Sequence, residues 1–180
     1  MSLGKTWGPA TWYIFHSISY NWDFKFINHY RKFFNLIART IPCHTCKRHF
    51  LSNIKKPKWV IRNNVLNKEK MINWLIDLHN EVNRRNRKRL IPYDNVRGIY
   101  LRENGELKYY RERYFIFMRE FIFYNFKFQF KKSIEILKLL AYIFPEPRRR
   151  AKLTHFVNKH QDIKKFGLFR WLRRYKNILM

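Results

Sequence analysis

The two cysteines of the chain, Cys43 and Cys46, lie three residues apart in the segment IPCHTCKRHF at positions 41–50. Two thiols at this spacing can bind a metal ion, pack as small apolar side chains, or close into a disulfide and exchange electrons. A cysteine at the start of a helix lies at the positive end of the helix dipole, and Lys47 and Arg48 add positive charge, so the thiolate is favoured. The setting therefore favours redox exchange.

Metal binding is the weaker interpretation of this segment. A zinc site needs four ligands in a tetrahedron, usually from two separated pairs. Here Cys43, His44, Cys46 and His49 fall within seven residues, and the chain has no second cysteine pair. We therefore predict no metal site. Haem attachment is excluded because Lys47, not histidine, follows Cys46. Two buried thiols without chemistry remain an open alternative.

Helical periodicity dominates the first hundred residues. Pro42 ends one helix, because the residue before a proline is pushed out of the helical region, and Cys43 begins the next helix. The expected helices cover about residues 8–20, 24–40, 43–56, 67–92 and, as a short fifth helix, 94–100. Short loops between such helices predict a small helical bundle. No strand precedes the cysteine pair, which excludes a thioredoxin scaffold.

The second half is also predicted to be helical. The segment YFIFMREFIFYNFKFQF (114–130) alternates in a way that allows a strand, but the apolar spacing continues at three and four through residues 133–140, which favours helix. We expect helices over 109–123, 126–144, 148–160 and 163–178. The predicted fold is all-α: a four-helix bundle with a short fifth helix in a domain of residues 1–102, followed by a helical C-terminal domain of residues 103–180.

The chain is strongly basic, with 39 Lys and Arg against 12 Asp and Glu and a net charge of +27. This charge attracts polyanions, nucleic acid among them, but an AT-rich coding bias explains it equally well. No signal peptide and no transmembrane segment is expected, because charged residues interrupt every apolar run. Two cysteines in this arrangement are typical of a protein made in a reducing compartment.

Two further segments give the cysteine pair a context. WGPATWYIFH (7–16) and WLIDLHNEVNRRNRK (74–88) lie on either side of PCHTC (42–46). Over about residues 5–102 the chain resembles the Erv/ALR family of FAD-linked sulfhydryl oxidases. That family has a Trp-x-x-x-His helix, a Pro-Cys-x-x-Cys between helices two and three, and His-Asn-x-Val-Asn with following basic residues on helix four. All three motifs occur here in the same order.

The resemblance implies a thiol oxidase that holds FAD, forms disulfides in client proteins and reduces oxygen to hydrogen peroxide. Cys46 would pass electrons to the flavin, and Cys43, expected nearer the surface, would exchange with the client. Carried over residue by residue, the cofactor contacts would be Gly8, Trp12, His16, His79, Asn80, Val82, Asn83, Arg87, Lys88 and Tyr100. Tyr100 stands where family members often have a tryptophan against adenine.

The chain also departs from many cellular relatives. They carry a shuttle cysteine pair and structural disulfides, one of them involving the position of Ile76, and this chain has neither. Its single pair resembles the oxidases of large cytoplasmic DNA viruses, which implies direct exchange with clients, a homodimer, and a place in the host cytoplasm or the virion. The rival interpretation is a basic helical module that binds nucleic acid or a virion protein, with a structural cysteine pair.

Overall fold

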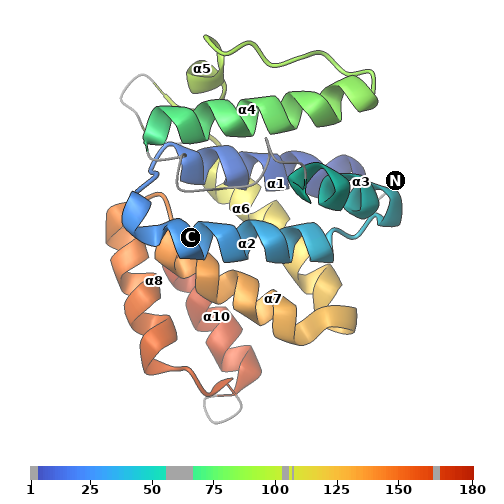
Figure 1. The fold of residues 1–180 in the computed structure, drawn as a ribbon. Coiled ribbons are helices and arrows are strands. Elements are labelled where there is room, and N and C mark those ends of the chain that lie inside the picture. Colours follow the sequence, from blue (N-terminus) through green and yellow to red (C-terminus); the bar gives the residue numbers. More distant parts are fainter. Residues whose placement is uncertain (1–3, 56–66, 103–105, 107, 164–166) are drawn as a thin grey trace.

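The computed structural model describes residues 4–55, 67–102, 106, 108–163 and 167–180. Its regular elements are all helices, as predicted. The first part contains α1 (Gly4–Ser19), the short 3₁₀ helix η1 (Phe24–Phe26), α2 (Ile27–Thr40), α3 (His44–Lys55), α4 (Lys68–Arg85) and α5 (Val96–Tyr100). Helices α1 to α4 form the expected bundle, and α5 lies beside α4 at its edge (Figure 1).

The second part continues with α6 (Tyr110–Ile116), the π-helix η3 (Phe117–Phe123), α7 (Tyr124–Ile143), α8 (Pro147–Lys159) and α10 (Leu168–Leu179). Helix is therefore confirmed over strand for the aromatic segment 114–130. Helix α7 packs along α2, while α6 and η3 pack against α1. Helices α8 and α10 lie at the end of the molecule away from α4 and α5 (Figure 1).

One apolar core runs through both parts of the chain. Its buried members include Phe15 and Phe33 from the bundle and Phe121 and Phe144 from the later helices. A buried hydrogen bond joins the two parts, with 3.1 Å between the Ser17 hydroxyl and the Tyr114 hydroxyl. The later helices thus pack directly on the bundle. The division into domains of residues 1–102 and 103–180 remains a prediction.

The prediction that the fourth helix continues to Pro92 is wrong. Helix α4 ends at Arg85, and Arg87 adopts a left-handed backbone conformation with φ of 53°. The backbone N–H of Lys88 then donates to the carbonyl of Asn83, and that of Arg87 donates to the carbonyl of Arg84. These bonds form a Schellman motif, which ends a helix by satisfying its last carbonyl groups. The absence of glycine here hid the motif in the sequence.

Two other helix boundaries differ from expectation. Helix α1 begins at Gly4 rather than Gly8 and contains Pro9, because the buried Trp7 anchors the preceding turn against Phe121, with ring centroids 6.0 Å apart. Of the helix predicted over 163–178, residues 164–166 lie outside the described part of the chain, and helix α10 begins at Leu168. The reason is Gly167, whose φ of 88° interrupts any helix.

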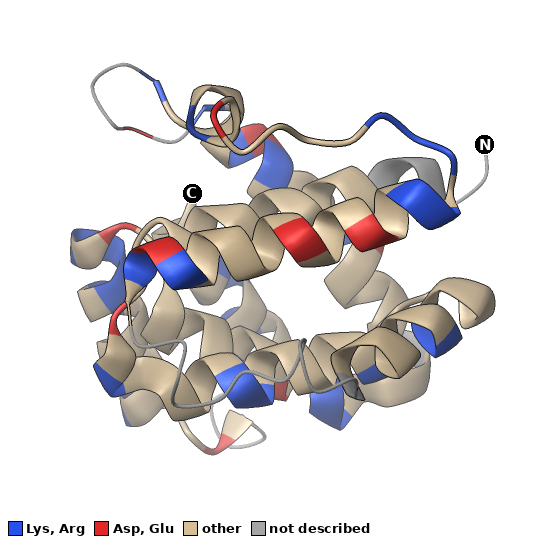
Figure 2. Cartoon of the chain, turned by 45° about the horizontal axis from the view of Figure 1, so that its top comes forward, with Lys and Arg blue, Asp and Glu red and all other residues tan. Residues whose placement is uncertain are grey.

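The positive charge is distributed over the fold rather than gathered on one helix (Figure 2). Among the helices of the described part of the chain, none is both long and apolar enough to span a membrane.

Candidate functional site

Cys43 and Cys46 form a disulfide at the start of α3, with their Cα atoms 5.2 Å apart. Ile41 and Pro42 separate α3 from α2, so Cys43 occupies the position just before the first helical residue, His44. The backbone N–H of Cys46 donates to the Cys43 sulfur at 3.1 Å. This donor and the positive end of α3 both stabilise negative charge on the Cys43 sulfur.

The two sulfurs differ in their surroundings. Cys46 is exposed and lines a cavity, whereas Cys43 is half-buried and packs against the core. The expectation that Cys43 lies nearer the surface is therefore wrong for the chain without ligand. The physical reason is that Cys46 owes its exposure to the open cavity. A molecule that filled the cavity would contact Cys46, whereas Cys43 does not line the cavity.

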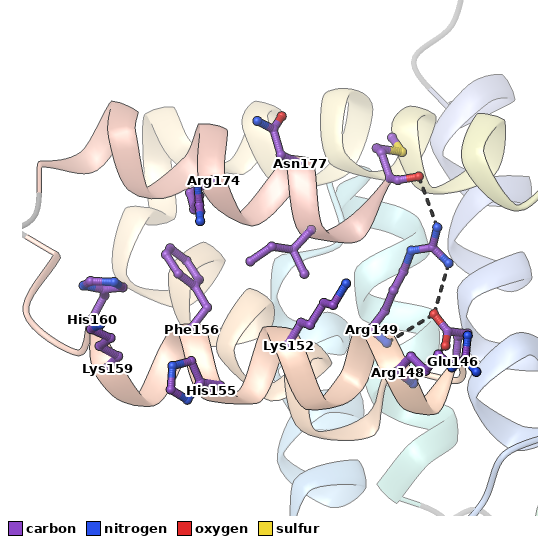
Figure 3. A pocket seen from close by; sticks show the side chains of 12 residues that line it. Glu146, Arg148, Arg149, Lys152, His155, Phe156, Lys159, His160, Arg174 and Asn177 are labelled. Atoms are coloured by element: carbon purple, nitrogen blue, oxygen red, sulfur yellow. Dashed lines mark hydrogen bonds and ion pairs between the residues drawn. The ribbon is translucent and has the colours of Figure 1, made fainter.

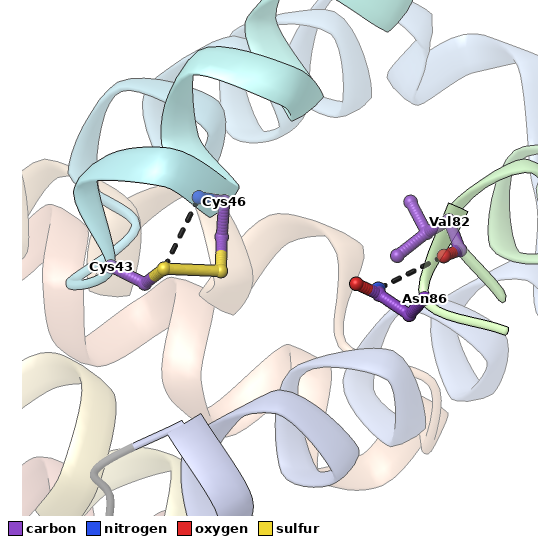
Figure 4. Close-up of a disulfide and its surroundings, with 4 residues drawn as sticks. All are labelled: Cys43, Cys46, Val82 and Asn86. Atoms are coloured by element: carbon purple, nitrogen blue, oxygen red, sulfur yellow. Dashed lines mark hydrogen bonds between the residues drawn. A yellow bond between two sulfur atoms is a disulfide. The ribbon is translucent and has the colours of Figure 1, made fainter. Parts of the chain in front are cut away.

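The cavity has a volume of about 770 Å³ and lies between α1, α3, α4, α5 and the start of α6. Apolar and aromatic side chains form most of its wall. Val82 of α4 and Asn86, the residue just after α4, stand opposite the disulfide (Figure 4). The lining residues are Trp7, Gly8, Pro9, Thr11, Trp12, Tyr13, Phe15, Ile41, Thr45, Cys46, His49, Phe50, Asn53, His79, Val82, Asn83, Arg85, Asn86, Lys88, Ile99, Tyr100, Tyr109 and Arg113.

Aromatic rings form one side of the cavity. Trp12 and His79 stack with their centroids 3.9 Å apart and their planes 4° from parallel. Behind them, His16 stacks on Tyr100 at 4.4 Å, and His16 Nε2 lies 3.0 Å from His79 Nδ1. The motifs of α1 and α4 therefore meet in a single ring cluster. Such a wall is flat and apolar, and suits a planar aromatic ligand.

Both histidines of this cluster are neutral at physiological pH. Burial, and next the nearby His79, hold the pKa of His16 well below its usual range. Burial, and next the charge of Lys88, lower the pKa of His79 to about 3. Nδ1 of His16 is buried and has no hydrogen-bond partner among the described residues. A bare lone pair costs less there than an unpaired N–H, so we assign His16 Nε2 as the donor to His79 Nδ1. His79 then carries its own proton on Nε2.

Three cations line the cavity, namely Arg85 and Lys88 at the end of α4 and Arg113 on α6. None of the three has an acidic side chain among the residues that line the cavity with it. Arg85 reaches Glu81 only at 4.0 Å. Arginine and lysine in this number suit a ligand with a diphosphate.

The structure brings most of the predicted cofactor residues to this cavity. Gly8, Trp12, His79, Val82, Asn83, Lys88 and Tyr100 line it. His16 lies one layer behind the wall and supports His79. Asn80 and Arg87 do not line the cavity. Asn80 instead pairs with the backbone of Ile91 through both its amide nitrogen and its amide oxygen, at 2.9 and 2.8 Å.

The role predicted for the asparagines of HNEVN therefore changes. The resemblance predicts that both asparagines contact the cofactor. Asn80 holds the segment after α4 through Ile91, and the Asn83 amide nitrogen donates to the carbonyl of Arg89 at 3.1 Å. Together these bonds tie residues 89–91 back along α4 and place Lys88 at the cavity.

Sequence reasoning missed lining residues of two kinds. Asn53, His49 and Phe50 share one face of α3 with Cys46, a relation that spacing of three, four and seven could have indicated. Tyr109 and Arg113 come from the region after residue 102, and no motif marks them. The second part of the chain thus contributes directly to the cavity.

The family model of the Erv1/Alr family matches residues 9–100. This chain belongs to the Erv1/Alr family. The match contains the ring cluster, the disulfide and every predicted cofactor residue except Gly8, which lies just before it. A relative from African swine fever virus (isolate Pig/Kenya/KEN-50/1950), described as an FAD-linked sulfhydryl oxidase, is 30% identical over 100 residues, which are 52% of this chain and 79% of the relative. No solved structure matches the chain.

The residues that line the cavity of this Erv1/Alr member fit the chemical groups of FAD. It combines a stacked aromatic wall, three cations and the sulfur of Cys46. It also has buried polar atoms without a partner in the described chain, including the indole nitrogen of Trp7, the hydroxyl of Tyr13 and both amide atoms of Asn53. Buried polar groups are normally paired, although unpaired ones also occur away from the cavity, at Tyr20, Trp22 and Trp74.

Proposed function

We propose that this protein is an FAD-dependent thiol oxidase that forms disulfides in client proteins. The observation that carries the proposal is the position of Cys46. Its sulfur lines the same cavity as the stacked pair Trp12 and His79 and the cations Lys88 and Arg113. A redox-active disulfide thus opens onto a site suited to a planar, phosphate-bearing cofactor.

The client reaction is a dithiol–disulfide exchange. A client thiolate attacks the Cys43 sulfur, the bond between Cys43 and Cys46 breaks, and Cys46 leaves as a thiolate. A second client thiolate then attacks the client sulfur of the mixed disulfide and releases Cys43. The client loses two electrons and two protons in this exchange, and the cysteine pair gains two electrons.

The surroundings of each sulfur support this order. Cys43 is the final leaving group, and the N–H of Cys46 at 3.1 Å together with the start of α3 stabilises its thiolate. A better leaving thiolate departs faster. Cys46 lines the cavity, so the Cys46 thiolate that the first attack releases would lie beside a cofactor bound there.

Bound FAD would accept two electrons from the cysteine pair and pass them to oxygen, which becomes hydrogen peroxide. The chain's own residues have other tasks. Trp12 and His79 provide a flat wall, and His16 fixes the proton of His79 on Nε2. Lys88, Arg85 and Arg113 would hold the diphosphate.

No second cysteine pair exists to relay electrons between client and Cys43. The client therefore meets Cys43 directly. We also keep a homodimer and a location in the host cytoplasm or the virion as predictions from the resemblance. Helices α6 and η3 cover part of α1, and α7 covers part of α2. The interface of a homodimer would therefore have to lie on other surfaces.

An oxygen-electrode assay tests the proposal. Purified protein with added FAD should consume oxygen when dithiothreitol is supplied and should release hydrogen peroxide in equal amount. The rival, a basic binding module with a structural cysteine pair, predicts a folded protein that neither binds FAD nor consumes oxygen.

A further inference from the structure

The amide of Asn53 has no partner in the described protein. The side chain lies on α3, seven residues after Cys46, and is 1% exposed. It nevertheless lines the cavity, and neither its amide oxygen nor its amide nitrogen has a hydrogen-bond partner among the described residues. Leaving both groups of an amide unpaired in a buried position is costly. The buried Asn80, Asn83 and Asn125 all have partners for their amide nitrogens.

We infer that Asn53 hydrogen-bonds the cofactor and positions it against Cys46, an inference that rests on the proposed function. An amide offers a donor and an acceptor side by side, which matches a ring edge that alternates N–H and C=O groups. The isoalloxazine ring of a flavin has such an edge, whereas its dimethylbenzene end does not. Asn53 therefore favours the orientation in which the pyrimidine side of the ring lies on α3, near the cysteine pair.

The variant Asn53→Leu distinguishes this role from a purely structural one, because it keeps the size of the side chain and removes the amide. The cofactor-free protein should melt at a higher temperature than wild type, since an unpaired buried amide is gone. Affinity for FAD, measured by titrating cofactor-free protein and following flavin fluorescence, should fall by about tenfold. Gain of stability with loss of affinity is the expected signature.

Two further variants complete the experiment. Asn53→Ala controls for a packing effect of leucine, because it removes the amide and adds no bulk. It should show the same loss of affinity for FAD. Asn125→Leu is the matched control, because the Asn125 amide is equally buried but donates to the carbonyl of Phe121. It should lower the melting temperature and leave FAD affinity unchanged. Wild-type affinity in both Asn53 variants would overturn the inference, whereas a wild type that binds no FAD would overturn the proposed function instead.

A second site lies far from the cavity, between α8 and α10. The two helices pack side by side and enclose a groove of about 770 Å³ (Figure 3). Arg148, Lys152, His155 and Lys159 recur along α8 at spacings of three and four, so they form one stripe on its surface. Helix α10 contributes Arg174 from the other side. The groove is therefore lined by cations on both walls.

Little negative charge offsets these cations. Glu146 is the only acidic residue among those that line the groove in the described chain, and it is bound by Arg149 at 3.0 Å. Within the described residues, no ion pair with a carboxylate is formed by Lys152, Lys159 or Arg174. A concave surface with unbalanced positive charge concentrates anions.

Apolar surface accompanies the charge. Phe156 and Ile178 form part of the groove wall. Phe169, at the start of α10, is 85% exposed and lies one turn before Arg173, which lines an adjoining pocket with His160 and Arg174. Phe169 lines neither the groove nor this pocket, but cations beside an exposed aromatic ring are typical of surfaces that bind single-stranded nucleic acid, where phosphates meet the cations and bases stack on the ring.

We propose that the groove between α8 and α10 binds single-stranded nucleic acid through its sugar-phosphate backbone. A planar membrane could not reach cations on both walls of a concave groove. Helices α8 and α10 lie away from α4 and α5 (Figure 1), and the groove shares no lining residue with the cavity.

Fluorescence anisotropy with a labelled oligothymidylate tests this site on the full chain. About four phosphate contacts predict a slope near −3 for the logarithm of affinity against the logarithm of salt concentration between about 50 and 200 mM. The triple variant Lys152→Ala, Lys159→Ala, Arg174→Ala should lose more than about tenfold in affinity at low salt and flatten the slope by about 2 units. Phe169→Ala should weaken binding about fivefold without changing the slope.

The matched control removes the same charges elsewhere: Arg39→Ala, Lys68→Ala and Lys70→Ala, three exposed cations of α2 and α4. It should bind as wild type does, apart from a small effect of net charge. Equal losses in the two triple variants would overturn the proposal in favour of a general charge effect. So would a duplex of the same length bound as tightly as the single strand. Binding to vesicles of phosphatidylcholine and phosphatidylserine without binding to the oligonucleotide would assign the groove to membranes instead.

Discussion

His16 and His79 share a buried hydrogen bond, with 3.0 Å between Nε2 of the first and Nδ1 of the second. One residue comes from the first motif and the other from the last, so this bond fixes α1 against α4 directly beneath the cavity wall. The bond requires Nδ1 of His79 to be unprotonated, and burial disfavours charge on both rings, which couples the integrity of the site to pH.

Stability should therefore decrease as the pH falls. The pKa of His16 and that of His79 are both lowered in the folded state, the latter to about 3, while the unfolded chain titrates near ~6.5. The stability that the two neutral histidines contribute is fully present above the pKa of the unfolded chain. It is lost as the pH falls toward the pKa of the folded state, because the unfolded chain then binds more protons than the folded chain. Urea unfolding should show a loss of about 3 kcal/mol between pH ~7.5 and about 5.5.

The double variant His16→Asn, His79→Asn should remove most of this pH dependence. His29→Asn is the control, because His29 has a lowered pKa from partial burial but lies outside the site. An equally steep decline in the double variant would show that other groups cause it.

The two cysteines should differ when replaced one at a time. Cys46→Ser should retain FAD, since it exchanges a single atom of the cavity wall, but should not transfer electrons to it. Cys43→Ser should block client oxidation while leaving the Cys46 thiolate beside the cofactor. In a Cys46→Ala variant, the free Cys43 thiolate should attack the disulfide of an oxidised client, release one client thiolate and remain as a mixed disulfide that mass spectrometry can detect. Clients trapped on Cys46 in a Cys43→Ala variant, and never on Cys43, would reverse the assigned order.

Arg113 should contribute to FAD binding although it lies outside the region that the family model matches. Arg113→Ala removes one cation from the cavity and should weaken FAD binding by about tenfold, the effect of losing one charge-assisted hydrogen bond. Arg111→Ala is the matched control, because Arg111 is exposed on the same helix and does not line the cavity. Isothermal titration of cofactor-free protein measures both. Equal affinities in the two variants would remove Arg113 from the site.

The hydroxyl of Tyr114 should matter for stability. It is buried and lies 3.1 Å from the Ser17 hydroxyl, which joins α6 to α1. Tyr114→Phe should lower the free energy of unfolding by about 1 kcal/mol, whereas Tyr109→Phe, at an exposed ring, should change it little. Both variants should unfold in a single transition if the later helices and the bundle share one core. Two separate transitions would instead support two independent domains.

The sequence predicted the bundle well because its signals are local. Apolar spacing along residues 27–40 places Tyr30, Phe33, Phe34 and Ile37 on one face, and the structure buries all four. Pro42 and Asn67 mark helix boundaries through their own backbone chemistry, and the Asn67 side chain accepts a hydrogen bond from the N–H of Lys70. Such features need no knowledge of the tertiary structure.

The predictions from sequence failed where contacts between distant residues determine the structure. The end of α4 depends on a left-handed Arg87, a conformation that sequence does not favour, and it is held by bonds from Asn80 and Asn83 to residues 89–91. The part played by Tyr109 and Arg113 depends on α6 packing against α1. No spacing rule within one segment reports such a contact, so the second half of the chain appeared separate from the site.

Anaerobic reduction of the bound flavin tests the central claim most directly. The claim is that electrons pass from a dithiol through Cys43 and Cys46 to FAD in the cavity. Protein loaded with FAD should lose the visible absorbance of oxidised flavin when dithiothreitol is added without oxygen, and should regain it when oxygen is admitted. Cys46→Ser protein, loaded to the same extent, should keep its absorbance. Bleaching at the wild-type rate in that variant, or a wild type that binds FAD but never bleaches, would contradict the account.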